Sequence, residues 1–295
     1  MGNYYYKEVA FVKYFLYKFF FTYPKVFSFL YYYTRKAWRE EFEDRIKFCY
    51  KKNDPEEIKK IVKGIAEIKG TRKAQKYLIP HINKQFVEKF VSVKGIQYLN
   101  QAIKEQRGVV LMTAHIGSPH QSFCSLRAMG YNVIVVKGGK PLLKNHHKYK
   151  YFDTEDNTIF VHKSVPSETN KKRIYKILNS GGLIYYTADA GLGEKSIKAM
   201  FLGKKMNFPT GMVHLAHQAN AVLIPLIHLY DSGRITLIFK EPVNNNREDD
   251  LCGYNNIIRK YIEILEEYII KYPEQYIGIY GPNVLSLYYQ SHNRK

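Results

Sequence analysis

Three things are scarce in this sequence, and the first is cysteine. Only 3 of the 295 residues are cysteine, and Cys49, Cys124 and Cys252 lie far apart without forming a Cys-X-X-Cys pair. A structural zinc site normally uses such pairs, and an odd count of cysteines argues against a disulfide framework. The sequence therefore favours a protein of a reducing compartment with no structural metal.

Negative charge is the second scarcity. The chain has 26 acidic residues against 46 lysines and arginines, which gives a formal net charge of +20 at pH 7. Such a surface attracts nucleic acid, anionic lipid headgroups or acidic proteins, and charge alone does not choose among them. Because the chain has no RRM signature, no zinc-ligand spacing and no recognisable helix-turn-helix, we expect no nucleic-acid partner.

Long apolar runs are the third scarcity. A membrane-spanning helix needs about 20 predominantly apolar residues. The run Val9–Phe21 is shorter, carries Lys13 and Lys18, and is soon followed by Pro24. Lysines in such a run extend to the headgroups while aromatic and aliphatic side chains enter the lipid boundary. We therefore expect residues 1–39 to form a membrane-interfacial helical segment, and the alternative is a helix that covers the core of the domain.

A helix start follows this segment. Asp54 suits an N-cap, Pro55 the first helical position, and Glu56 and Glu57 the first turn. Apolar residues then recur at helical spacing, at Ile58, Ile61, Val62 and Ile65. The sequence predicts a helical lead-in over residues 40–90.

Short strands alternate with helices in the rest of the chain. Apolar runs typical of buried strands are Val109–Thr113, Val133–Val136, Ile159–Val161, Leu183–Thr187, Val222–Ile227 and Ile235–Phe239. Helical patterns lie among them, at Pro119–Met129, Thr169–Leu178, Thr210–Gln218 and Asn255–Lys271. This alternation predicts an α/β domain over residues 91–295, with a mixed, mostly parallel central sheet flanked by helices.

A histidine stands where one of these strands gives way to a helix. His115 follows Val109–Thr113, and Gly117, Ser118 and Pro119 then open the helix. The carboxyl ends of strands in an α/β sheet face the usual ligand crevice, and a helix start offers free N–H groups to an anion. Because histidine titrates nearest to neutral pH, His115 is a candidate general base, and a purely structural histidine is the alternative.

Several blocks of the sequence together resemble one known family. They are Phe90–Gly95, Gly108–Gly117, Gly181–Asp189, Phe201–Gly203, Phe208–Gly211, Leu215–Ala216, Ala221–Pro225 and Leu265–Gln275. In their order and spacing they resemble the bacterial lipid A biosynthesis acyltransferases, the late acyltransferases of the lysophospholipid acyltransferase superfamily. The resemblance covers about residues 90–280.

What the resemblance implies is acyl transfer at the cytoplasmic face of a bacterial inner membrane. The family moves a fatty acyl chain from an acyl-carrier-protein thioester to a hydroxyl of a membrane glycolipid, and acyl-CoA is the alternative donor. His115 would take the hydroxyl proton, and no metal or nucleotide cofactor is implied. The partners implied are acyl carrier protein, an anionic lipid or glycolipid acceptor and the membrane surface.

The chain departs from the family at the partner of the histidine. The family's motif is His, four residues, then Asp or Glu, and His120 occupies that last position here. A neutral histidine accepts a proton from Nδ1 but offers no countercharge to the imidazolium. Three interpretations stay open: a weaker dyad of His115 and His120, a role for Asp189 at another strand end, or an impaired relative that binds anionic lipid without turnover.

The blocks that resemble the family, together with basic residues near the predicted site, give a set of residues that we expect to bind substrate. They are Thr113, Gly117, Ser118, Lys137, Phe201, Gly203, Lys204, Lys205, Thr210 and Gly211. More basic residues flank them, at Lys140, Lys144, His146, His147, Lys148, Lys150, Lys195 and Lys198. A basic rim would steer an acidic carrier protein towards the site, and a solvated basic face is the alternative. A second departure follows Gln275, where the family commonly has Trp and basic residues, so acceptor recognition is expected to differ.

Overall fold

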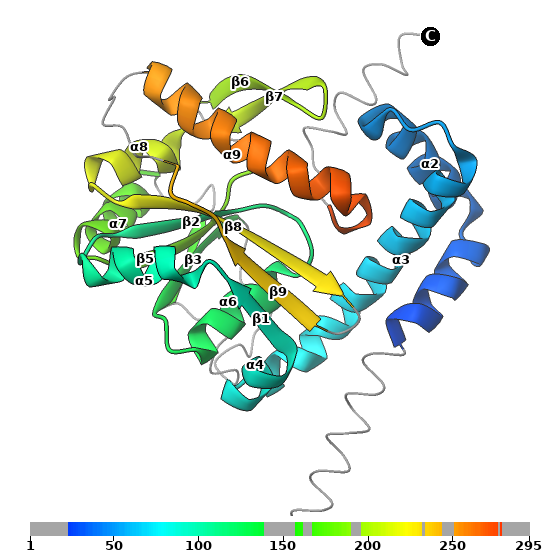
Figure 1. Ribbon diagram of the computed structural model, residues 1–295, viewed down its shortest axis with the longest axis horizontal. Coiled ribbons are helices and arrows are strands. Elements are labelled where there is room, and N and C mark those ends of the chain that lie inside the picture. Colours follow the sequence, from blue (N-terminus) through cyan, green and yellow to red (C-terminus); the bar gives the residue numbers. More distant parts are fainter. Residues whose placement is uncertain are drawn as a thin grey trace, which may run out of the picture.

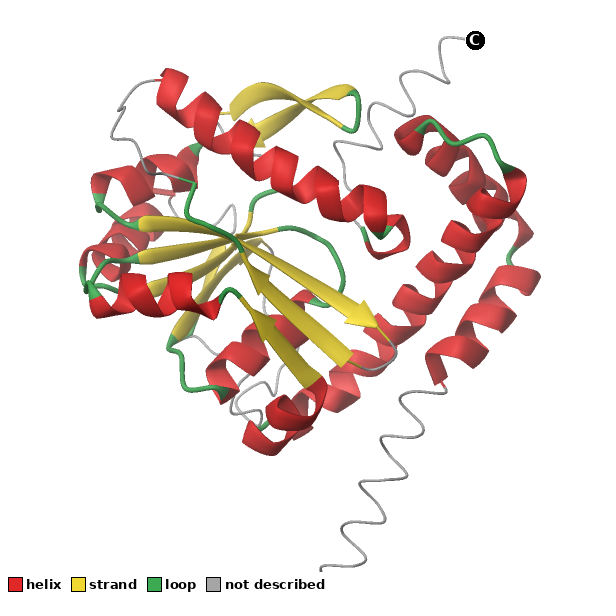
Figure 2. Cartoon of the chain, in the orientation of Figure 1, coloured by secondary structure: helices red, strands yellow, loops and turns green. Residues whose placement is uncertain are grey.

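A seven-stranded sheet forms the centre of the molecule (Figure 1, Figure 2). The computed structural model describes residues 23–138, 157–161, 167–189, 196–231, 234–243, 251–276 and 278. The strands in spatial order are β1 (Val91–Lys94), β9 (Arg234–Phe239), β8 (Val222–Asp231), β2 (Val109–Thr113), β5 (Leu183–Thr187), β3 (Val133–Gly138) and β4 (Thr158–Val161). All neighbours are parallel except β8 and β9, which confirms the predicted mixed, mostly parallel sheet.

Helices cover both faces of this sheet. On one face lie α7 (Ser167–Asn179), α8 (Gly211–Gln218) and α9 (Leu251–Lys271), and on the other lie α4 (Lys84–Phe90), α5 (Ile96–Lys104) and α6 (Pro119–Ala128) (Figure 1). Alternate residues of β2 point to opposite faces of the sheet. Val110 and Met112 belong to the hydrophobic cluster that includes α9, and Val109 and Leu111 belong to the one that includes α6. A strand that is buried on both faces has a continuous apolar sequence. For this reason the predicted bounds of β2 and β5 agree with the observed ones.

The N-terminal helices pack against the same core. A helix over residues 23–34 is followed by α2 (Lys36–Tyr50), α3 (Pro55–Leu78) and η1 (Ile79–His81). The helix start predicted at Asp54 is confirmed, because the backbone N–H of Glu56 donates to Asp54 Oδ1 at 3.1 Å. Along α3, Ile65 joins the cluster on the α9 side and Ile68 the one on the other side, so this helix closes one end of the sheet.

The predicted interfacial segment is described only in part. The run Val9–Phe21, with Lys13 and Lys18, lies outside the described residues. The helix over 23–34 runs beside α3, where Ser28 Oγ donates to the carbonyl oxygen of Lys63 at 3.0 Å (Figure 1). Within the part of the chain that the structure describes, no helix is both long and apolar enough to cross a membrane.

An antiparallel hairpin was not predicted. Its strands β6 (Ser196–Phe201) and β7 (Lys204–Pro209) lie outside the central sheet and pack against α9 (Figure 1). Leu202 and Gly203 form the turn, with φ of 51° and 71°. Buried and exposed residues alternate along β6, so a period of two was present in the sequence. After α9 the chain makes a short helical turn, η3 (Pro273–Gln275), which packs against α3.

Gly95 generates a stability prediction. It joins β1 to α5 with φ of 72°, and a Cβ added there would lie 2.0 Å from the carbonyl oxygen of Phe239 on β9. We expect Gly95→Ala to lower the free energy of unfolding by about 2–4 kcal/mol, from left-handed strain and overpacking. Urea denaturation measures it. Gly211→Ala is the control, because a Cβ there meets nothing within 4 Å; equal losses in the two variants would contradict the packing argument.

Candidate active site

The register of the sheet brings two side chains to one level. β2 and β5 are parallel neighbours, and Thr113 at the end of one pairs with Thr187 at the end of the other. His115 and Asp189 each lie two residues beyond those ends, and the backbone N–H of Ala188 donates to the carbonyl oxygen of Thr113 at 2.7 Å. Two strands far apart in sequence therefore deliver an imidazole and a carboxylate to the same edge of the sheet.

The carboxylate of Asp189 holds the histidine at two points. Its Oδ1 lies 2.8 Å from His115 Nδ1, and its Oδ2 accepts the backbone N–H of His115 at 3.0 Å. The Asp189 side chain is 0% exposed, whereas that of His115 is 40% exposed. Among the described residues no protein group bonds to Nε2 of His115. The ring is thus held from inside the protein through Nδ1 and reachable from outside.

The charges around His115 set its protonation. The carboxylate of Asp189 raises the pKa of His115 above its ordinary value, burial and the positive charge of Arg72 oppose that rise, and the hydrogen bond to Asp189 supports it. Arg72 belongs to α3, in the helical lead-in. No local pattern singles Arg72 out, because α3 meets the site only in the folded chain.

His120 has a different environment. It lies in the first turn of α6, and its ring packs against that of Phe123, with 5.7 Å between the ring centres. Because Nδ1 of His115 is engaged by Asp189, the geometry favours Asp189 over His120 among the interpretations that the sequence left open.

Thr113 points into the protein. It is fully buried, and its hydroxyl lies 2.9 Å from Nε2 of His228 on β8. Burial lowers the pKa of His228 to about 3, so this second histidine stays neutral behind the site. The hydroxyl of Tyr261, on α9, donates to the carbonyl oxygen of Thr113 at 2.6 Å. These contacts fix the end of β2, and His228 was missed because it lies inside an otherwise apolar strand.

Gly117 and Ser118 shape the turn between the strand and α6. Gly117 has φ of 55°, and a Cβ there would lie 2.2 Å from the carbonyl oxygen of His228. Its backbone N–H donates to the carbonyl oxygen of Gln275 at 2.9 Å. Ser118 is buried, and its hydroxyl donates to Oε1 of Gln121 at 2.7 Å. The structure therefore gives both residues packing and hydrogen-bonding roles within the protein.

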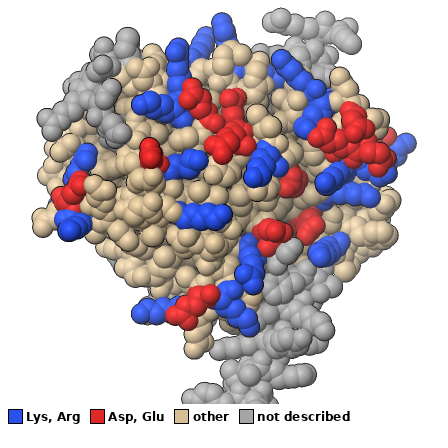
Figure 3. Space-filling view, in the orientation of Figure 1, with Lys and Arg blue, Asp and Glu red and all other residues tan. Residues whose placement is uncertain are grey.

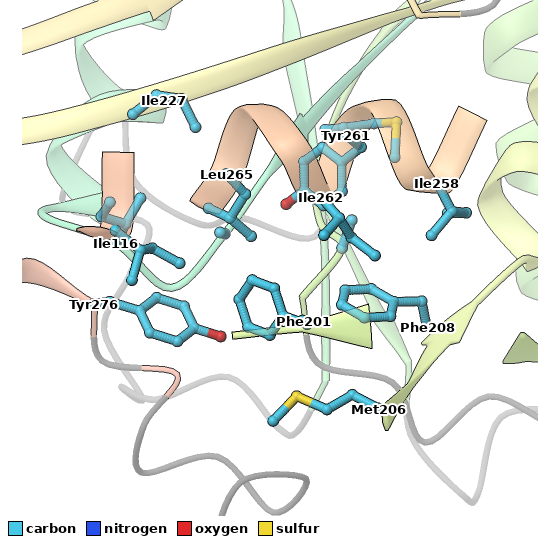
Figure 4. Packing of buried hydrophobic residues seen from close by; sticks show 14 of the residues in the cluster. Ile116, Phe201, Met206, Phe208, Ile227, Ile258, Tyr261, Ile262, Leu265 and Tyr276 are labelled. Atoms are coloured by element: carbon cyan, nitrogen blue, oxygen red, sulfur yellow. The ribbon is translucent and has the colours of Figure 1, made fainter. Parts of the chain in front are cut away.

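Two of the predicted substrate-binding residues of the hairpin pack against other parts of the protein. Phe201 is buried, with its ring edge-on to Phe208 and Tyr276 (Figure 4). Lys204 places its ammonium group 3.5 Å from the centre of the Phe48 ring on α2. Gly203 forms the turn and Lys205 is exposed on β7. The structure thus brings His115 and Asp189 together, whereas the hairpin residues pack against α2 and the core beside α9.

The remaining predicted residues are also dispersed. Lys137 on β3 lies with its ammonium group 5.4 Å from the centre of the Phe160 ring. Thr210 caps α8, where its carbonyl oxygen accepts the N–H of His214, and Gly211 is the first residue of that helix. Lys198 lies on β6, while other basic residues of the predicted rim lie outside the described residues, namely Lys140, Lys144, His146, His147, Lys148, Lys150 and Lys195.

A groove of about 850 Å³ lies apart from the histidine. It is bordered by the helix over 23–34, by α3 and by η3, and Lys60, Lys63 and Glu274 are among its lining residues. Burial raises the pKa of Glu274, and the positive charge of Lys60 opposes that rise. No three His, Cys, Asp or Glu side chains of the described residues are grouped to hold a metal ion.

Comparisons with known proteins identify a family. The model of the family "Bacterial lipid A biosynthesis acyltransferase" matches residues 12–280, which confirms the resemblance seen in the sequence. No curated protein matches. Among solved structures, the 1-acyl-sn-glycerophosphate (LPA) acyltransferase PlsC from Thermotoga maritima is similar at 13% identity and a TM-score of 0.39, over 84% of this chain and 96% of that one.

The pairing of His115 generates a prediction that needs no substrate. Because the charge of Asp189 is the largest cause of the raised pKa of His115, Asp189→Asn is expected to lower that pKa, and His120→Gln to leave it raised. Titration of the imidazole nitrogens by NMR measures both. A pKa that stays raised without the carboxylate, or that falls without His120, would contradict Asp189 as the partner of Nδ1.

Proposed function

This chain belongs to the family of bacterial lipid A biosynthesis acyltransferases, and from that premise we propose that it transfers a fatty acyl chain from an acyl thioester to a hydroxyl of a lipid acceptor. The observation that carries the proposal is the imidazole of His115, accessible at 40% of its side-chain surface and bonded through Nδ1 to a buried carboxylate. That arrangement is the one a general base needs when it is oriented by a second group.

The proposed reaction uses the free nitrogen of the ring. Neutral His115 accepts the proton of the acceptor hydroxyl at Nε2 while the oxygen attacks the thioester carbonyl. Asp189 stabilises the imidazolium that forms, since its carboxylate already receives Nδ1–H. The tetrahedral intermediate then collapses, the carbon–sulfur bond breaks, and the imidazolium returns the proton to the leaving thiolate. The products are an ester and a free thiol, and no covalent intermediate on the protein is required.

The proposed donor is acyl carrier protein, with acyl-CoA as the alternative, and the proposed acceptor is an anionic glycolipid or phospholipid. The net charge of +20 supports association with acidic or anionic partners. On the face in Figure 3, however, lysine and arginine are spread out and mixed with acidic residues. The charge therefore supports long-range attraction without marking one docking patch on that face.

The helix over 23–34 supports a further part of the proposal, contact with the cytoplasmic face of the inner membrane. Val26, Phe29, Leu30 and Tyr33 are each more than half exposed. Their spacing of three and four residues places them along one stripe of the helix. Lys25 lies beside the stripe, and Arg35 and Lys36 follow it. An apolar stripe next to basic groups suits the boundary of an anionic bilayer.

The competing proposal is a relative that binds anionic lipid without turnover. The observation that favours it is His120 in the position where the family has an acid. The two proposals share the lipid surface and differ in thiol release, so one assay separates them.

We expect loss of the base to abolish most turnover. His115→Ala should lower kcat for thiol release from acyl carrier protein, in the presence of a lipid extract, by about 10²–10⁴-fold. Asp189→Asn should lower kcat by about 10²–10⁴-fold.

The dependence of the rate on pH should report the same pair. In the wild type the rate should rise with pH through the raised pKa of His115, because only the neutral ring accepts a proton. Asp189→Asn should move this rise to lower pH. His217→Ala is the control, and equal rates in His115→Ala and the control would exclude His115 as the base.

We also expect the apolar stripe to govern binding to lipid. Phe29→Ser combined with Leu30→Ser should weaken binding to anionic liposomes about 10²-fold or more, since each side chain contributes about 1.5–3 kcal/mol when buried. Flotation measures the bound fraction. Ile103→Ser with Tyr175→Ser is the matched control, because those side chains are also exposed but lie on α5 and α7. Equal weakening by both pairs would argue against a specific membrane face.

A further inference from the structure

The groove beside the N-terminal helices lies outside the proposed catalytic site. Its volume is about 850 Å³, and its described lining residues do not include His115 or Asp189. It is bordered by the helix over 23–34, by the first half of α3, and by the end of α9 with η3. In Figure 1 the helix over 23–34 and the end of α9 both lie beside α3. Segments distant in the sequence therefore border one hollow, whose volume is within the range of roughly 300–1,000 Å³ typical of small-ligand sites.

Apolar side chains are exposed at this groove from two different elements. Phe29 and Tyr33 come from the helix over 23–34, and Ile270 comes from the last turn of α9. Each of them is more than half exposed. Phe29 and Tyr33 also belong to the apolar stripe that is proposed above to contact the bilayer. The groove is therefore continuous with that stripe, and α9 adds a further apolar residue at its edge.

Positive charge predominates among the polar side chains of the groove. Of the described residues, five lysines and three glutamates line it. Lys52 forms an ion pair with Glu57. The glutamates that remain are Glu67 and Glu274, and they face the four groove lysines, Lys25, Lys60, Lys63 and Lys271. Since lysine binds phosphate as a point charge, this balance favours an anionic ligand.

Lys63 is held in the groove by its neighbours. Its ammonium group donates to the hydroxyl of Tyr33 at 3.3 Å and lies 5.2 Å from the centre of the Tyr32 ring. The backbone carbonyl oxygen of Lys63 accepts the hydroxyl of Ser28 at 3.0 Å. These contacts place one cation beside an exposed aromatic ring of the stripe. A cation that is already oriented loses less conformational freedom when it binds an anion.

We propose that this groove binds an anionic phospholipid of the membrane, with the phosphate of its headgroup among the groove lysines and its acyl chains against the exposed apolar side chains. A phospholipid joins a negative charge to apolar chains, which matches both chemistries of the groove, whereas free phosphate matches only the lysines. The inference rests on the membrane contact in the proposed function and deepens it, because it names the class of lipid that the N-terminal helices bind. The site is separate from the one at which an acceptor would meet His115.

Titration with a monomeric phosphatidylglycerol of short acyl chains tests the site without a bilayer. The wild type should bind one lipid per chain, and the amide resonances of Ser28 and Gly64, which line the groove, should shift in NMR spectra. Phosphatidylcholine of the same chain length, which has no net negative charge, and glycerol 3-phosphate, which has no acyl chains, should bind about tenfold more weakly or less well still. Shifts confined to the surroundings of His115, or equally tight binding of glycerol 3-phosphate, would overturn the inference.

Lysine variants test the charge of the groove. The combination of Lys25→Gln, Lys60→Gln and Lys271→Gln should weaken binding of phosphatidylglycerol about 100-fold, since each basic residue beside an anionic group contributes roughly fivefold. The matched control removes the same charge at three lysines that are also exposed but lie on α4, α5 and α7, namely Lys84→Gln, Lys104→Gln and Lys176→Gln. The control should change binding by less than about threefold, because salt screens distant surface charges. Equal weakening by the two triple variants would contradict a site in the groove.

The opposite change of charge gives a result that misfolding does not imitate. Glu67→Gln removes a negative charge that lines the groove, so it should tighten binding of phosphatidylglycerol about fivefold. Unchanged or weaker binding in this variant would count against the proposal. These titrations use neither a thioester nor a bilayer, so they decide the role of the groove even if no acyl transfer is found or the protein does not float with liposomes.

Discussion

The hydrogen bond between His115 Nδ1 and Asp189 Oδ1 is the interaction on which the site depends. It exists because β2 and β5 are parallel neighbours in a register that pairs Thr113 with Thr187, so that both side chains lie two residues beyond their strand ends. The contact gives the imidazole one orientation and raises its pKa, and it leaves Nε2 accessible. In our proposal, Asp189 from the neighbouring strand takes the role of the acid that the family has at the position of His120.

The rest of the fold holds that edge of the sheet in place. Tyr261 on α9 bonds to the carbonyl of Thr113, and the Gln275 turn bonds to Gly117 and β8. Behind them, the neutral ring of His228 meets the Thr113 hydroxyl. These supports are all buried groups with named partners, which is what a site built for precise orientation needs. The hairpin β6–β7 contributes by packing Phe201 against the ring of Tyr276.

The sequence predicted the parts that depend on local pattern. Continuous apolar runs located β2 and β5, and the position of His115 after a strand made it a candidate base. Asp189 remained one interpretation among three, because neither the strand order nor the register is encoded locally. His228 and Arg72 were missed because the groups they interact with lie far away in sequence. Phe201 was assigned to substrate by resemblance, whereas the structure buries it in the core.

The most direct measurement is mass spectrometry of a lipid extract incubated with acyl carrier protein thioester and this protein. The account predicts a lipid species heavier by one fatty acyl group, formed by the wild type and absent with His115→Ala. The same species formed at the same rate by His115→Ala, or free thiol released without any acylated lipid, would contradict the claim that His115 activates a lipid hydroxyl.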